Sequence, residues 1–482
     1  MSLSFCFEIK LIKSSFARFF KVRKNYKMKK IVAKFGGSNL KKKEDILKLV
    51  RVIKVYDRPM VIVVSAFYGI TNRLIKSLEA VKKDEGEISN LTDFLLSMKE
   101  EVIKEHFTDV EIAKQTLTAI EQRVSELKRY LTGIHYIGEV PEFVEDVILS
   151  YGERLSSLLL AAILRNNGIE AEEALPEDMP LITDGEFGNA TVDYKRAEAG
   201  VKKKLSGDKV YVVPGFYGVS VEGKVTLLGR GGSDYSAAAL ARCLDAESLD
   251  VWKDVDGFMS ADPKLVEGPV LIKSLTYTEA AELSYFGAGI LHPRTVEPLK
   301  ETGIPVRILN IDTFKKEISC GTKIHASETI TEGIIKSVTH SDDFCVLKLR
   351  GAGVGVKRGV LAKVSGALDN AGINIKSVIT SQIAINLLLS ARDIKRAYRV
   401  IDRLGLSAIT EIEAIEQLST IATVGEGLLE HPGVAGRIFS ALARENINIR
   451  MIVSGASSVA TYFIVAASDR DTAISAIHKE FF

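Results

Sequence analysis

Lys34 and two adjacent glycines form the clearest candidate for chemistry in this sequence. Lys34 precedes Gly36 and Gly37 in the segment KFGGSN, which follows a short run of β-branched residues. Adjacent glycines let backbone N–H groups approach an anion closely, and a neighbouring ammonium offsets phosphate charge. Together with Ser38 the segment predicts a phosphate-binding loop, although a plain turn after a strand has the same residues. No G-x-x-x-x-G-K-[ST] sequence occurs in the chain, so the loop is not a P-loop.

A second glycine-rich segment, LGRGGSDY, places Arg230 beside paired glycines. A guanidinium group binds a carboxylate through two parallel hydrogen bonds, which makes this loop a candidate carboxylate site. Ser233 or Asp234 can cap the helix that we predict over residues 233–244. A capped helix after a tight turn, with no ligand, is the alternative interpretation.

Three further segments, VVSAFYGITN, SYGERLS and ILHPRT, carry polar side chains at expected element ends. Ser65 and Thr71 either offer hydroxyl groups to a ligand or cap the following helix. SYGERLS is predicted to open a buried helix, where Glu153 and Arg154 form either a first-turn charge pair or part of a site. His292 is interpreted as a packing or hydrogen-bonding residue before a proline.

The composition excludes several classes of partner. The 482 residues include 64 basic and 62 acidic side chains, a net charge of +2, so no overall field recruits nucleic acid or an anionic membrane. The closest approach to a membrane span, the apolar run ending at Ile163, is too short to cross a bilayer. The four cysteines have neither metal nor disulfide spacing, so we expect a cytoplasmic protein without a dedicated metal site. Residues 1–27 are rich in Lys and Arg and represent either a targeting segment or a start placed too early before Met28.

The order of apolar runs predicts a mostly parallel sheet. From residue 31, short β-branched runs such as IVAKF and MVIVVSA alternate with longer helical stretches, the pattern of βαβ units. Residues 90–168 are predicted to form helices at one edge of this sheet. Strand signals return in KVYVVPGF, KVTLLGR, SLDVWKDVDG and PVRILN.

The last third of the chain contains an internal repeat. The segments GVLAKVSGALDNAGINIKSVITS and GVAGRIFSALARENINIRMIVSG begin at Gly359 and Gly433, 74 residues apart. Gly351 and Gly425 precede them with the same spacing. Each unit predicts the start of a small βαββαβ module, and two such modules are expected to pack on each other or on those of another subunit.

Six segments together resemble the aspartate kinases: KFGGSN, VVSAFYGITN, SYGERLS, LGRGGSDYSAAALA, WKDVDGFMSADPKLV and ELSYFGAGILHPRT. They occur in the family's order, and the repeat is similar to its two ACT regulatory domains. The resemblance covers residues 28–482. It implies a three-layer α/β/α sandwich, the amino-acid kinase fold, over residues 28–328. ACT domains are expected at 329–412 and 413–482.

The resemblance also assigns roles to residues of this sequence. It implies a kinase that uses ATP with Mg²⁺ to phosphorylate the side-chain carboxylate of L-aspartate. Lys34 and Asp234 match the catalytic positions, and the substrate positions are Ser65, Thr71, Glu153, Arg230 and Ser233. The nucleotide positions are Lys34, Gly36, Gly37, Ser38, Lys253, Asp254, Met259, Lys264, Gly289 and Ile290.

The nucleotide segments depart from the family pattern at several positions. Gly289 stands where a lysine is typical, Met259 where a tyrosine is common, and Lys264 in place of arginine. Lys253 stands before Asp254 where the family commonly has threonine. One hypothesis is that Lys253 restores the positive charge missing at Gly289. The alternative is a variant with slightly weaker nucleotide contacts.

The paired ACT domains imply feedback control by an amino acid. The matching effector positions are Asn374, Ile375, Thr380, Ser381 and Gln382. Lys376 and Gln382 occupy a region where lysine-sensing relatives place acids, which favours threonine over lysine as the effector. A homodimer or homotetramer through the ACT domains is expected. Two alternatives stay open: a catalytically weakened amino-acid sensor, and a kinase for another small carboxylate such as glutamate.

Overall fold

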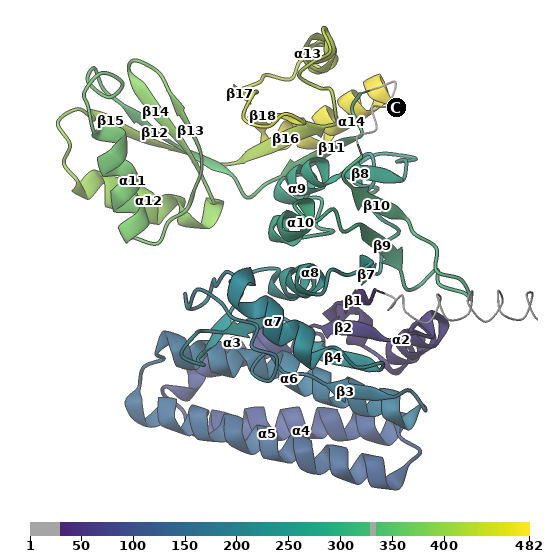
Figure 1. Ribbon diagram of the computed structural model, residues 1–482. Coiled ribbons are helices and arrows are strands. Elements are labelled where there is room, and N and C mark those ends of the chain that lie inside the picture. The colour runs from purple at the N-terminus through teal and green to yellow at the C-terminus, as the bar shows by residue number, and fades with distance from the viewer. Residues whose placement is uncertain (1–28, 328–333) are drawn as a thin grey trace, which may run out of the picture. The chain divides into compact units, whose positions relative to one another are not determined.

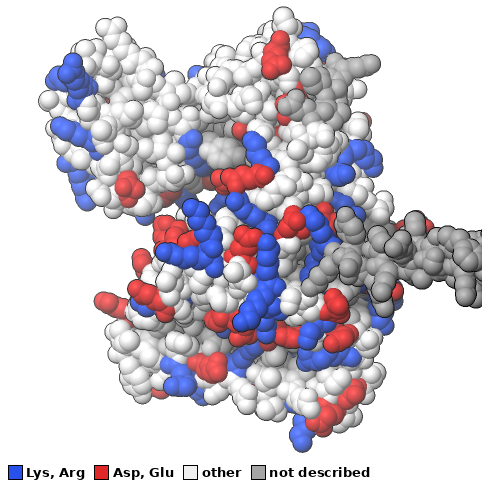
Figure 2. All heavy atoms as spheres, in the orientation of Figure 1, with Lys and Arg blue, Asp and Glu red and all other residues white. Residues whose placement is uncertain are grey.

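The computed structural model describes residues 29–327 and 334–482, so the predicted N-terminal extension lies outside the described residues. The chain divides into two compact units. The first contains the residues up to Lys34, Tyr56–Leu227 and Ala239–Asp250. The second contains Phe35–Val55, Leu228–Ala238 and Val251–Phe482. Figure 2 shows acidic and basic side chains interspersed on the visible face, in keeping with the near balance of charge.

The central feature of the fold is an eight-stranded sheet in the order β3-β4-β2-β1-β7-β9-β10-β8 (Figure 1). The β2/β4, β3/β4 and β10/β8 pairs are parallel, and β10 pairs antiparallel with β9. β1, β2 and β4 are buried at every position, as expected for apolar strands covered on both faces. The mostly parallel sheet predicted from the sequence is therefore confirmed. The strands span Ile31–Phe35 (β1), Met60–Val64 (β2), Ala171–Glu173 (β3), Val210–Pro214 (β4), Ser248–Lys253 (β7), Ser274–Thr276 (β8), Val306–Asn310 (β9) and Thr322–His325 (β10).

In the first unit, α6 (Glu142–Asn166) is the main helix covering the strands. It packs against β2, β3 and β4, so the prediction that residues 90–168 only decorate a sheet edge is wrong for this helix. α6 is long and apolar enough to cross a membrane, but 83% of its apolar window is buried inside the structure, as in a core helix. α3 (Ile70–Val81), α4 (Gly86–His106) and α5 (Val110–Ile137) complete a helical layer with it, and α7 (Tyr194–Lys204) follows.

The second unit contains the turn and helices that carry the remaining motifs. A single helical turn, η1 (Gly37–Leu40), follows β1, and α8 (Gly232–Leu244) begins at the second glycine pair, one residue before the predicted start. α9 (Tyr277–Tyr285) begins with a capping box between Thr276 and Glu279. The other helices of this unit are α2 (Lys43–Tyr56) and α10 (Pro293–Lys300). The short pair β5 (Tyr217–Val219) and β6 (Val225–Leu227) precedes the arginine loop in the chain and belongs to the first unit.

The repeat forms two four-stranded antiparallel sheets, ordered β13-β14-β12-β15 and β11-β16-β18-β17. The first contains β12 (Cys345–Arg350), β13 (Ile375–Thr380), β14 (Ala384–Leu389) and β15 (Glu411–Ile415), with α11 (Val360–Asn370) and α12 (Ile394–Arg403). The second contains β11 (Ser337–Ser341), β16 (Leu418–Val424), β17 (Met451–Val453) and β18 (Ala460–Ala466), with α13 (Val434–Arg444) and α14 (Arg470–Phe481).

The two modules are not sequential, because the first is inserted into the second. β11 precedes the whole first module, yet it pairs with β16 in the place that β15 takes beside β12. Two glycines at matching positions of the repeat show that β11 and β15 are equivalent strands. A Cβ on Gly351 would lie 1.9 Å from the carbonyl oxygen of Ala408, which precedes β15. A Cβ on Gly425 would lie 1.9 Å from the carbonyl oxygen of Ile334, which precedes β11. A division into 329–412 and 413–482 therefore does not match the two sheets.

Candidate functional site

The lysine loop begins at the end of β1. Lys34 is 5% exposed, and the helical turn after it starts at Gly37. The N–H of Gly36 donates to Oδ1 of Asn39 at 3.1 Å, so the amide of Gly36 is engaged within the loop rather than held open for an anion as predicted. The first N–H groups of a helical turn have no partner within it, which leaves the amides of Gly37 and Ser38 as the cradle.

Asn39 is a residue of this loop that the sequence analysis did not assign. It is 1% exposed, and its Nδ2 has no hydrogen-bond partner among the described residues. A buried amide donor without an acceptor is costly, and it suits a place beside an incoming oxyanion. The signal in the sequence was its position two residues after the glycine pair.

Two aromatic residues connect the lysine loop to β7. The rings of Phe35 and Trp252 stack at 6.1 Å between centroids with an interplanar angle of 6°. The next residue, Lys253, places its Nζ 3.8 Å from a carboxylate oxygen of Asp234. Lys253 and Asp234 side chains are only 18% and 10% exposed, so this charge pair is partly shielded from water. Lys253 therefore lies at the predicted catalytic acid.

The arginine loop is shaped by residues that come from α10. Gly231 has φ +72°, and a Cβ there would lie 2.3 Å from the Cβ of His292, so only glycine fits under this histidine. Arg294 donates from Nη1 to the carbonyl oxygen of Leu228 at 2.8 Å and lies over the Tyr235 ring. Arg230 itself is exposed and its guanidinium is available to a ligand.

His292 has the packing role expected from the sequence. Burial lowers its pKa, and the positive charges of Arg294 and Arg230 lower it further, while Asp234 opposes them. The imidazole is consequently neutral at physiological pH. A neutral ring between two arginines adds no third positive charge to the loop.

In the first unit, α6 brings Glu153 and the VVSAFYGITN segment together. A Cβ on Gly152 would lie 2.8 Å from the Cβ of Ala66, so the glycine of SYGERLS permits close packing against the segment after β2. The N–H of Phe67 donates to Oγ of Ser156 at 3.2 Å. Glu153 is 4% exposed between these two contacts along the helix.

Two structural alternatives from the sequence analysis are wrong in this region. α3 begins at Ile70 with Gly69 at the N-cap and no side-chain cap, so neither Ser65 nor Thr71 caps it. SYGERLS lies in the middle of α6 rather than in a first turn, because that helix begins at Glu142. The hydroxyls of Ser65 and Thr71, both half-buried, are thus not used as caps.

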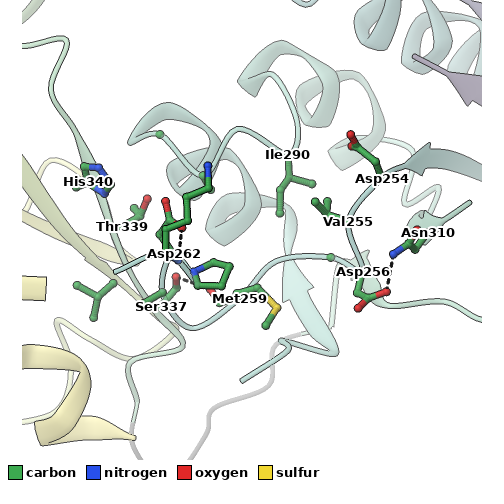
Figure 3. A pocket seen from close by; sticks show the side chains of 17 residues that line it. Asp254, Val255, Asp256, Met259, Asp262, Ile290, Asn310, Ser337, Thr339 and His340 are labelled. Atoms are coloured by element: carbon green, nitrogen blue, oxygen red, sulfur yellow. Dashed lines mark hydrogen bonds between the residues drawn. The ribbon is translucent and has the colours of Figure 1, made fainter. Parts of the chain in front are cut away.

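A pocket of about 490 Å³ in the second unit contains several of the predicted nucleotide residues (Figure 3). Figure 3 shows Asp254 and Asn310 on one side and Thr339 and His340 on the other. Asn310 donates to Asp256 at 2.8 Å and steadies the VDG turn. The lining residues are Asp254, Val255, Asp256, Gly257, Met259, Ala261, Asp262, Pro263, Lys264, Gly287, Ala288, Ile290, Asn310, Ser337, Val338, Thr339 and His340.

Gly289 lies between two residues that line this pocket. Its φ is +64°, and a Cβ there would meet only the carbonyl oxygen of Gly287, at 3.8 Å. The position has space for a side chain but a backbone conformation that favours glycine. The sequence analysis suggested that Lys253 restores the positive charge missing at Gly289. Lys253 lies next to Asp234, whereas Gly289 lies beside the pocket.

One wall of the pocket comes from the regulatory part of the chain. β11, an edge strand of the second ACT sheet, contributes the residues from Ser337 to His340. The Val338 N–H donates to the carbonyl oxygen of Ser260 at 2.8 Å. The Ser337 hydroxyl donates to the carbonyl oxygen of Met259, also at 2.8 Å. Ser260 also contacts His478 of α14 through its side chain, at 2.8 Å. The sequence analysis did not predict this wall.

The FGAGI segment, residues 286–290, lines the pocket and packs against both ACT sheets. Phe286 is 1% exposed and packs with Phe344 before β12 and Tyr462 on β18, at centroid distances of 6.4 and 4.8 Å. Thr339 donates to the carbonyl oxygen of Phe286 at 3.2 Å. A Cβ on Gly287 would lie 2.1 Å from the carbonyl oxygen of His340, so β11 approaches the segment as closely as a glycine permits.

A buried ion pair reinforces the same junction. Lys336 and Glu279 approach to 2.8 Å with side chains 3% and 0% exposed. The other carboxylate oxygen of Glu279 accepts from the Glu426 N–H at 2.9 Å, and the Thr276 hydroxyl donates to Glu426 at 2.7 Å. Since a buried carboxylate with all its oxygens engaged has few alternative arrangements, the start of α9 and the second ACT sheet are joined rigidly.

The predicted effector residues lie on and beside β13, the edge strand of the first ACT sheet. Asn374, Thr380, Ser381 and Gln382 are exposed and Ile375 is half-buried. Lys376 pairs with Asp343 at 3.0 Å and lies 3.9 Å from the centroid of the Phe344 ring. The predicted effector strand therefore contacts Phe344, the ring that packs on Phe286.

Among the described residues, no three or more His, Cys, Asp or Glu side chains gather as a possible metal site. Mg²⁺ commonly enters such sites on the phosphates of the nucleotide with few protein ligands. Asp234 follows the glycines of the arginine loop, and Asp254, Asp256 and Asp262 line the pocket, so carboxylates are present for a cation that a nucleotide carries in.

Comparison with known proteins places these sites in a family. The Amino acid kinase family matches residues 29–310, and an ACT domain family matches residues 347–403 and 421–481. The aspartokinase of Schizosaccharomyces pombe is 30% identical and covers 93% of this chain and 92% of its own length. The bifunctional aspartokinase/homoserine dehydrogenase of Buchnera aphidicola is 29% identical over 93% of this chain, which spans only 56% of that protein.

Solved structures agree with the sequence relatives. E. coli aspartokinase III in complex with aspartate and ADP (R-state) matches with a TM-score of 0.80 and 27% identity, covering 94% of this chain and 100% of that one. The same enzyme in complex with lysine and aspartate (T-state) matches with a TM-score of 0.76 and 27% identity, covering 94% and 99%. This chain belongs to the aspartokinases of the amino acid kinase family.

Proposed function

We propose that this protein transfers the γ-phosphate of ATP to the side-chain carboxylate of L-aspartate and forms 4-phospho-L-aspartate. This reaction is the first step of lysine, methionine and threonine biosynthesis in the resembling family. The E. coli structure with aspartate and ADP supports both substrates. The observation that carries the proposal is the 490 Å³ pocket, which gathers Asp254, Met259, Lys264 and Ile290 and has the size of a small-molecule site.

The proposed reaction requires no general base. A carboxylate is ionised at neutral pH and attacks phosphorus without a general base, so catalysis rests on positioning and charge stabilisation. Lys34 offsets the charge of the transferring phosphoryl group, and Asp234 orients the lysine and the Mg²⁺-bound phosphates. Arg230 holds the α-carboxylate of aspartate and Glu153 its ammonium, with hydroxyls from Ser65, Thr71 and Ser233.

One assay separates this function from its two alternatives. The protein is incubated with MgATP and either L-aspartate, L-glutamate or no acceptor, and acyl phosphate is trapped with hydroxylamine. Aspartate alone should give hydroxamate and stoichiometric ADP, and Lys34→Met should give neither. Hydroxamate with glutamate instead would indicate another carboxylate kinase, and ATP binding without hydroxamate would indicate a sensor.

Feedback by an amino acid at the ACT modules is the second part of the proposal. The T-state structure of the E. coli enzyme contains lysine, whereas this chain has the ammonium of Lys376 in the effector region, which favours threonine. The edge strand β13 carries exposed apolar side chains at Val378 and, just beyond it, Ile383, and suits pairing in a homodimer or homotetramer. Inhibition by threonine with no effect of lysine at equal concentration is expected. The reverse result would contradict the effector assignment.

A further inference from the structure

Lys99 is a buried lysine in the first unit for which the proposed chemistry has no use. It lies on α4, is 1% exposed, and its Nζ has no hydrogen-bond partner among the described residues. Elsewhere on these helices, Arg73 of α3 pairs with Glu87 of α4 at 2.8 Å, and the Ser77 hydroxyl donates to the same carboxylate. Lys99 is thus an unusual group in this helical layer, because buried charges are normally paired.

The ammonium of Lys99 contacts the face of one aromatic ring. Its Nζ lies 3.5 Å from the centroid of Phe67, well within the range of a cation–π interaction. Burial lowers the pKa of Lys99 to about 7, and no charged side chain of the described chain adds to this effect. The electron-rich face of Phe67 is the interaction that favours the charged form.

Phe67 belongs to the segment between β2 and α3 that bears Ser65 and Thr71. The same segment is held from the other side by α6, through the Phe67 N–H on Ser156 and the packing of Ala66 on Gly152. Gly69, with φ +85°, ends the segment at the N-cap of α3 in a backbone conformation that favours glycine. Lys99 and α6 therefore both contact this segment, through Phe67 and Ala66.

We propose that Lys99 is a positioning residue that holds the Ser65–Thr71 segment in its aspartate-binding conformation by a cation–π contact with Phe67. The inference rests on the proposed function, because it assumes that this segment binds aspartate. A methionine or leucine at position 99 would fill the same space without a desolvated charge. The ammonium is therefore informative, since packing alone does not require it.

The central test compares Lys99→Met with the wild type in the hydroxamate assay. KM for aspartate should rise on the order of 10-fold, with kcat and KM for ATP changed less than 2-fold. At pH 6.5 the variant should also melt at a higher temperature, since it lacks a buried charge. A side chain that only supports the fold would not raise thermal stability and weaken one substrate together. Lys104→Met, an exposed lysine of the same helix, is the matched control and should change nothing.

The pH dependence supplies an independent readout. The folded-state pKa is lowered to about 7, so the ammonium loses its charge as pH rises above that value. KM of the wild type for aspartate should therefore increase between pH 6.5 and 9 towards that of Lys99→Met, whose own profile stays flat. A second variant, Phe67→Leu, should show the same increase in KM, and Lys99→Met with Phe67→Leu should add nothing to either.

The outcomes separate this inference from the proposed function. Wild-type protein without hydroxamate activity would overturn the proposed function, and the inference with it. Active wild type with an unchanged aspartate KM in Lys99→Met and Phe67→Leu would overturn the inference alone. Equal losses for aspartate and ATP would also overturn it, because they would indicate a general structural role.

Discussion

The proposed aspartate-binding segment, residues 65–71, and the proposed nucleotide pocket are built in contrasting ways. Residues 65–71 are held by contacts from α4 and α6, two helices of the kinase domain itself. The pocket at Asp254–Lys264 takes one wall from β11, and its FGAGI segment packs on both ACT sheets. Any rearrangement of the ACT modules must therefore move atoms that line the pocket. The contrast indicates that feedback acts on nucleotide binding more directly than on aspartate binding.

The strongest test of the substrate side is Glu153→Gln. Glu153 is proposed to bind the aspartate ammonium, so loss of its buried negative charge should raise KM for aspartate about 100-fold. KM for ATP should stay within about 2-fold. Steady-state kinetics in both substrates measures this, with Glu145→Gln, an exposed acid of the same helix, as control. Equal increases for both substrates would remove the distinction between the two regions.

Gly287→Ala tests the close approach of β11 to the pocket. The new Cβ would lie 2.1 Å from the carbonyl oxygen of His340 at φ +106°, so the strand must withdraw. We expect ADP affinity to fall about 30-fold and the free energy of unfolding to fall by about 2–4 kcal/mol. Calorimetric titration and thermal unfolding measure the two effects. Gly289→Ala, at φ +64° in open space, should lose only about 1 kcal/mol of stability.

Phe286→Leu tests whether the aromatic contact transmits the effector signal. A leucine keeps the position apolar but loses the stacking on Phe344 and the tilted ring contact with Tyr462. The effector concentration for half-inhibition should rise about 10-fold, while uninhibited kcat changes little. Phe439→Leu, in the outer core of the second module, is the control and should leave inhibition intact. Unchanged inhibition in Phe286→Leu would show that the signal takes another route.

Lys253→Ala should have the smallest effect. Its ammonium lies 3.8 Å from Asp234 and adds positive charge at the predicted phosphate region, so KM for ATP should rise about 5-fold. An unchanged KM would contradict the idea that Lys253 compensates for Gly289. The result also sharpens the comparison, because aspartate KM should not respond.

Local patterns in the sequence predicted the elements well. The β-branched runs became β1, β2, β4 and β7, and the 74-residue repeat became two modules in which Gly359 and Gly433 both have positive φ. Such features depend on residues a few positions apart. The ends of helices were less predictable. SYGERLS was expected to open a helix, but α6 begins eight residues before Ser150, and no side-chain cap marks its start.

Contacts between residues far apart in the chain could not be predicted from the sequence. Nothing in SVTHS indicates that β11 pairs with β16, about 80 residues later, because a short run of mostly polar residues specifies no pairing partner. Likewise, Lys99 occurs beside two glutamates in the sequence of α4, and its burial and its contact with Phe67 are visible only in the fold. The motifs predicted the candidate site residues, whereas the pocket wall and the burial of Lys99 became visible only in the fold.

Hydrogen exchange of β11 tests most directly the claim that the second ACT module forms part of the nucleotide pocket. The backbone amides of residues 337–341 and 254–264 are followed with and without saturating MgADP. Protection should increase in both segments, because both line the same pocket. Protection confined to residues 254–264, with no change in β11, would contradict the account.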